Sequence, residues 1–99
     1  QAWKKRSERL VADWVRAQRA GAALDSPEVR QLVDRHVAWL GEIPGTPTHT
    51  GDRKRSSAMI RGLARMYVQD PAMRHAFGGR VGAEFVRDAL LMHIEEEQE

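Results

Sequence analysis

Apolar residues recur three or four positions apart along most of the chain, which is the spacing of one face of an α-helix. No segment alternates apolar and polar residues as a half-buried β-strand would. The pattern therefore predicts an all-α domain of about five helices. The predicted helices cover about residues 2–20, 27–41, 53–68 and 71–77, and a last helix begins near residue 81.

Residues that commonly start or stop helices lie at the ends of these segments. Gly21 follows the first segment in the C′ position that favours a left-handed backbone. Ser26 and Pro27 form an N-cap and first helical position for the second segment, and Asp70 and Pro71 do the same for the short one. These residues predict where each helix begins and ends.

Two further patterns define the loop and the core. The segment 44–52, PGTPTHTGD, is dense in proline, glycine and threonine, and this composition predicts an irregular loop. The helical stripes predict which side chains face inward: Trp3, Leu10, Trp14, Val15, Ala17, Val29, Leu32, Val33, His36, Val37, Leu40, Ile60, Leu63, Tyr67, Phe85, Val86, Ala89, Leu90 and Ile94.

Length and composition indicate one globular domain over residues 1–99. Apolar residues make up 41% of the chain and charged residues 30%, as in folded globular proteins. No apolar run approaches the ~20 residues that span a bilayer, so no membrane association is expected. The sequence contains no cysteine, which excludes disulfides and thiolate ligands and agrees with a cytoplasmic location.

Catalytic and metal-binding motifs are not evident, so neither an enzyme nor a metal or other cofactor is predicted. The histidines show no i, i+4 ligand pair, and no carboxylate cluster completes a site. The pair Ser56-Ser57 lacks a G-x-S-x-G context, and Gly78-Gly79 lacks the lysine of a phosphate-binding loop. The four histidines considered are His36, His49, His75 and His93.

One basic cluster consists of Arg53-Lys54-Arg55 with Arg61 and Arg65. A nucleic-acid contact and a solvated helix face both account for such a cluster. The net charge is only +2 and no aromatic residues are interleaved, so the solvated face is the preferred interpretation. No direct nucleic-acid contact by this domain is therefore predicted.

Three tryptophans and four methionines are many for a chain of 99 residues. Core packing explains most of them, but tryptophan offers a flat apolar surface and methionine adapts its shape to bulky ligands. Two hypotheses follow. Either these side chains line a groove for an apolar small molecule, or they form a helical protein–protein interaction or dimerisation surface.

The stretch 62–90, GLARMYVQDPAMRHAFGGRVGAEFVRDAL, resembles the C-terminal part of the TipA-type (TipAS) antibiotic-recognition domain found in MerR-family regulators. Earlier positions are also similar to the family: Gly21, the cap at 25–28, and Arg35-His36. The positions that carry the resemblance are Leu63, Ala64, Met66, Tyr67, Val68, Asp70, Pro71, Phe77 and 85–89.

This resemblance implies a globin-like helical fold that binds thiopeptide-like or other multidrug-type antibiotics in a cleft. The domain would act as the sensor of a transcription regulator or as a drug-sequestering resistance protein. The residues expected to line the ligand groove are Trp14, His36, Trp39, Met59, Met66, Tyr67 and Phe77.

Two departures from the family pattern change the expectation. Thiopeptide-binding members capture their ligand through a cysteine at a position that falls at or near Arg55 here, so non-covalent binding is expected. Family members also extend further upstream, so we expect that segment and any DNA-binding domain to be absent from residues 1–99. A homodimer formed through the missing upstream region is left open.

Overall fold

The computed structural model describes residues 2–97, which form six helices and no strand in that range. The helices are α1 (Ala2–Arg19), α2 (Pro27–Leu40), α3 (Pro47–Thr50), α4 (Arg53–Gln69), α5 (Pro71–Ala76) and α6 (Arg80–Glu97). The all-α class is confirmed, while the globin-like arrangement stays a prediction. Within the described range, every helix is too short or too polar to cross a membrane.

The predicted loop 44–52 contains one turn of helix, α3, that the sequence interpretation missed. Thr46 caps this turn, because its side chain accepts a hydrogen bond from the backbone N–H of His49 at 3.2 Å. Pro47 occupies the first helical position, where its missing N–H costs nothing. Gly51 ends the turn with a φ of 83°, so the loop is a capped turn rather than irregular chain.

The bend between α4 and α5 is held by two polar side chains. Asp70 ends α4 and also caps α5, since its carboxylate accepts from the backbone N–H of Ala72 at 3.1 Å. Arg74 reaches back and donates to the carbonyl oxygen of Val68 at 2.8 Å. These bonds satisfy backbone groups that a helix end leaves without partners. The predicted cap at Asp70 and Pro71 is confirmed.

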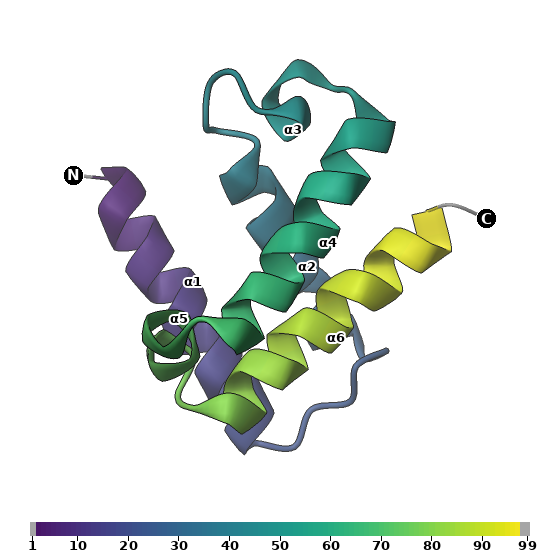
Figure 1. Cartoon of the computed structure of the whole chain (residues 1–99). Coiled ribbons are helices and arrows are strands. Elements are labelled where there is room, and N and C mark those ends of the chain that lie inside the picture. The colour runs from purple at the N-terminus through teal and green to yellow at the C-terminus, as the bar shows by residue number, and fades with distance from the viewer. Residues whose placement is uncertain (1, 98–99) are drawn as a thin grey trace.

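Helix α6 is the centre of the packing, because it contacts α1, α2, α4 and α5. Figure 1 shows α4 and α6 side by side, with α5 closing the turn between them. The buried side chains of α6 pack against those of the other helices in a single core. That core consists of Leu10, Trp14, Ala17, Val29, Leu32, Val33, Leu40, Ile60, Ala64, Tyr67, Phe77, Ala83, Val86, Ala89, Leu90 and Ile94, with His36 as its buried polar residue.

Most predicted core positions are buried, with one clear exception. Trp3 keeps 42% of its surface exposed, so its assignment to the core was wrong. Its ring stacks on that of Trp39 instead, with centroids 5.1 Å apart. The first turn of α1 extends past the core, and the tryptophan there covers a neighbouring helix instead of entering the interior. Val15, Val37, Leu63 and Phe85 are only half-buried.

Helix α1 packs on one side of the molecule only. Its main backbone contacts are with α2 and α6. In Figure 1, α1 and α4 accordingly diverge from each other towards the end of the molecule that carries α3. The side of α1 that faces α5 therefore remains available for a groove.

Gly82 in α6 tolerates no side chain, and this predicts a large loss of stability in Gly82→Ala. A methyl group there would overlap the backbone carbonyl oxygen of Phe77, so the α5–α6 turn would have to move. The higher helix propensity of alanine offsets about 1 kcal/mol of this loss of stability. The net expectation is a loss of about 2–4 kcal/mol in the free energy of unfolding, measured by urea denaturation.

Gly62→Ala is the matched control, because Gly62 lies inside α4 with nothing within 4 Å of the added methyl group. For Gly62→Ala we expect the free energy of unfolding to rise by about 0.5–1 kcal/mol. Equal effects of the two substitutions would show that the overlap with Phe77 does not govern the response.

Candidate functional site

A chain of hydrogen bonds crosses the core and joins three helices. The indole Nε1–H of Trp14 in α1 donates to His36 Nδ1 in α2 at 3.1 Å. The second ring nitrogen of His36 lies 3.0 Å from the hydroxyl oxygen of Tyr67 in α4. Because an indole can only donate, Nδ1 must accept. A neutral His36 therefore carries its hydrogen on Nε2 and donates it to Tyr67.

Burial keeps these groups in their neutral forms. His36 is 1% exposed, and loss of solvation lowers its pKa from 6.5 to about 4. The same cause raises the pKa of Tyr67 to about 12. A buried imidazolium would have to break the bond from Trp14, because it has no lone pair left to accept it.

Aromatic rings surround this chain of bonds. Tyr67 packs against Phe77 with ring centroids 5.0 Å apart. His36 meets Trp39 edge-on at 5.4 Å. The indole N–H of Trp39 donates to Ser7 Oγ at 2.7 Å, so this ring is fixed against α1. The cluster thus holds α1, α2 and α4 at defined positions.

The structure brings the predicted ligand residues together, mostly inside the core. Trp14, His36, Tyr67 and Phe77 are each no more than 3% exposed. The other three are half-buried and pack against that core: Trp39, Met59 and Met66. Contact between these seven side chains and a ligand stays a prediction, and for the buried four it would require the core to open.

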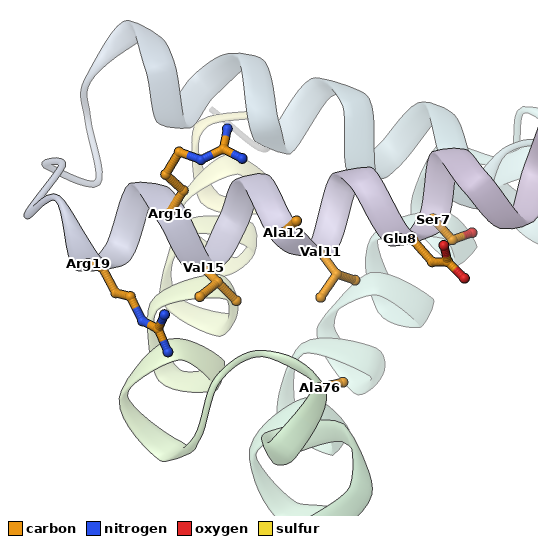
Figure 2. A pocket seen from close by; sticks show the side chains of 8 residues that line it. All are labelled: Ser7, Glu8, Val11, Ala12, Val15, Arg16, Arg19 and Ala76. Atoms are coloured by element: carbon orange, nitrogen blue, oxygen red, sulfur yellow. The ribbon is translucent and has the colours of Figure 1, made fainter.

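A groove with a volume of about 750 Å³ lies between α1 and α5. Its apolar lining comes from Val11, Ala12 and Val15 of α1 and from Ala76 at the end of α5. Figure 2 shows Val11 and Val15 pointing from α1 towards α5 and the turn that follows it. None of the seven predicted residues lines this groove.

Polar side chains border the two ends of this α1–α5 groove. Ser7 and Glu8 lie at one end, and Arg16 and Arg19 at the other (Figure 2). Gly78 lies close to Val15, since a Cβ atom added at Gly78 would be 3.3 Å from that side chain. The groove is therefore an apolar trough with charged rims.

Sequence reasoning missed the α1–α5 groove, although a signal for it exists. Val11 and Val15 are four residues apart and share a face of α1 that lies beside the main apolar stripe. Ala12 adds a small residue to that face. A second apolar face on one helix indicates a second contact surface, and here a groove lies along it.

A smaller groove of about 510 Å³ lies between α1 and α2. Its floor is apolar, and its borders carry charged side chains. The lining residues are Arg6, Arg9, Leu10, Arg35, Ala38, Trp39 and Glu42. Of the seven predicted ligand residues, Trp39 is the one that borders this groove.

Two other features of the sequence can also be placed. In the described range, no three His, Cys, Asp or Glu side chains come close enough to hold a metal ion. The basic cluster lies at the start of α4 and along it, with Arg53, Lys54, Arg55 and Arg65 exposed. Exposure fits a solvated helix face and a nucleic-acid contact equally, so the preference for the solvated face stays a prediction.

The depressed pKa of His36 predicts a loss of stability in mild acid. In the unfolded chain His36 binds a proton near pH 6.5, whereas in the fold it does so only near pH 4. The unfolded state therefore binds more protons between these values, and stability falls as the pH drops through this window. From pH 7 to pH 5 the expected loss is about 2 kcal/mol, measured by urea denaturation.

His36→Gln tests this assignment, because the amide can accept from Trp14 and donate to Tyr67 without titrating. The difference in stability between pH 7 and pH 5 should shrink by most of that amount. An unchanged pH dependence in this variant would contradict the role given to His36.

Comparison with known proteins places the chain in a family. A family model described as the TipAS antibiotic-recognition domain matches residues 1–93. Searches of curated proteins and of solved structures each found no match. The family match runs through all six helices up to the last turn of α6. Because it covers far more than half of the sequence, the chain belongs to the TipAS antibiotic-recognition domain family.

Proposed function

We propose that this domain binds a bulky, largely apolar small molecule or antibiotic non-covalently in the α1–α5 groove. The observation that carries the proposal is the groove itself, an apolar trough of about 750 Å³. This volume falls within the ~300–1,000 Å³ that small-molecule sites commonly have. The description of the family as an antibiotic-recognition domain agrees with such a ligand.

The groove offers little chemistry besides apolar contact. Val11, Val15 and Ala76 provide the surface, and Arg19 at one end can donate hydrogen bonds to a ligand carbonyl. Arg16 points to the other side of α1 (Figure 2) and is paired with Asp13 at 3.1 Å. The sequence contains no cysteine, so no thioether to a ligand can form. Arg55, at or near the position of the family's cysteine, is exposed in the first turn of α4. These features support reversible binding.

The buried aromatic cluster would act as a rigid support for the groove. Trp14 is fixed by its hydrogen bond to His36, and it lies one helical turn from Val11 in α1. A groove whose wall is already positioned loses less conformational entropy when a ligand binds. In this proposal Trp14, His36, Tyr67 and Phe77 position α1, and Met59 and Met66 pack beside them on α4.

Binding would serve either sensing or sequestration. If a DNA-binding domain belongs to the same protein, a ligand that bridges α1 and α5 would favour one arrangement of these helices and shift the population of the active state. Without such a domain, binding would simply lower the free concentration of the antibiotic. The presence or absence of a DNA-binding domain in the full reading frame distinguishes the two roles.

A panel of thiopeptide and other apolar antibiotics tests the proposal through tryptophan fluorescence. At least one member should change the emission in a saturable way. The variant Ala12→Arg places a long charged side chain in the groove from an exposed helix position. We expect this variant to bind the best ligand at least about tenfold more weakly, which corresponds to about 1.4 kcal/mol of binding free energy.

The control is Ala58→Arg, which makes the same change at an exposed position of α4 outside the α1–α5 groove. Its affinity for the ligand should equal that of the unmodified protein. If no antibiotic changes the fluorescence and the protein sediments as a dimer, the domain is an interaction module instead.

A further inference from the structure

The α1–α2 groove combines an apolar floor with guanidinium groups on its rim. Leu10 and Ala38 form part of the floor, and the half-buried ring of Trp39 completes it. Trp39 cannot turn freely, because Trp3 stacks on it and its N–H is bonded to Ser7. The groove is thus a flat apolar surface held in place by side chains of α1.

Three arginines and one glutamate line this groove, so its charge is positive. Arg6 is paired with Glu42 at 2.7 Å, which orients its side chain across the groove. Arg35 is oriented by Asp13, which accepts from it at 2.9 Å. Arg9 has no ion pair within the described part of the chain. One guanidinium group is therefore available for an anion, beside two that are already positioned.

This groove is separate from the α1–α5 groove. At 100° per residue, Arg6, Arg9 and Leu10 point from a different face of α1 than Val11, Ala12 and Val15. The two grooves share no lining residue. A ligand in one does not occupy the other.

We propose that the α1–α2 groove is a second binding site, specific for a small aromatic or apolar carboxylate. The apolar body of such a molecule would lie on Leu10, Ala38 and Trp39. Its carboxylate would accept hydrogen bonds from Arg9, with Arg6 and Arg35 adding favourable charge. Arginine suits this role because its planar group can donate two parallel bonds to a carboxylate.

Size and charge together favour a small molecule over a macromolecular partner. The volume of about 510 Å³ lies in the range of small-ligand sites. Glu42 closes part of the rim and would repel a long acidic segment. A single carboxylate on an apolar body needs only the one guanidinium group that is available, that of Arg9.

Two matched probes test the proposal: naphthalene-2-carboxylate and its neutral analogue naphthalene-2-carboxamide. Titrations of the ¹⁵N-labelled protein should show saturable shifts of the Trp39 indole N–H and of the Ala38 amide with the carboxylate. We expect the carboxamide to bind about tenfold more weakly. Raising the salt concentration from about 50 to about 500 mM should weaken the binding of the carboxylate but not that of the carboxamide, because salt screens exposed charges.

Arg9→Gln should lower the affinity for the carboxylate about tenfold and leave the affinity for the carboxamide unchanged. Since Arg9 pairs with no carboxylate among the described residues, this variant leaves no acidic group without its partner. Arg19→Gln is the control, because it removes the same charge from the other groove. Its affinity for the carboxylate should change less than about twofold, as expected for screened long-range charge.

Several outcomes would overturn the proposal. Equal affinity for the two probes would remove the anion specificity, and equal weakening by both variants would indicate a non-specific charge effect. Shifts at Val11, Val15 and Ala76 would place the probe in the α1–α5 groove. Saturable binding of an acidic peptide, without binding of the naphthoate, would assign the groove to a protein partner.

Discussion

The imidazole of His36 connects three helices that the chain brings together from distant segments. Trp14 in α1 donates to one ring nitrogen, and the other donates to Tyr67 in α4. Water does not reach these buried groups, so each needs a hydrogen-bond partner within the protein. A buried donor or acceptor without a partner lowers the stability of the fold by about 1–3 kcal/mol. The apolar stripe of each helix determines which face turns inward, and these directional bonds restrict the rotation of the three helices further. The position of α1 depends on them.

The placement of α1 explains why the molecule has two grooves. One face of this helix packs into the core through Leu10, Trp14 and Ala17. Two other faces remain partly uncovered, one towards α5 and one beside α2. The first is apolar in its middle and charged at its ends, and the second has arginines around a tryptophan. One helix therefore contributes to two surfaces with different chemical preferences. Both surfaces depend on the buried hydrogen bonds of His36 with Trp14 and Tyr67.

Much of the fold could be predicted from local sequence because its signals are local. Proline and its capping partners mark the starts of α2 and α5, and the 3.6-residue period identifies the core positions of α6. The α3 turn escaped prediction, although Thr46-Pro47 is the same kind of signal as Ser26-Pro27. The surrounding glycines and threonines favoured a loop. Trp3 was misplaced because periodicity shows which residues share a face but not how far a helix extends beyond the core.

The sequence by itself determined the helical class, most helix ends, the family, and the exclusion of a covalent thioether through its lack of cysteine. Only the tertiary structure decided which aromatic residues are buried and where the surface is hollow. Trp14 and Trp39 both lie on amphipathic helices, yet one is fully enclosed and the other borders a groove. The physical reason is that burial depends on which helix covers a given face. That coverage results from contacts between segments far apart in the chain, which no local pattern records.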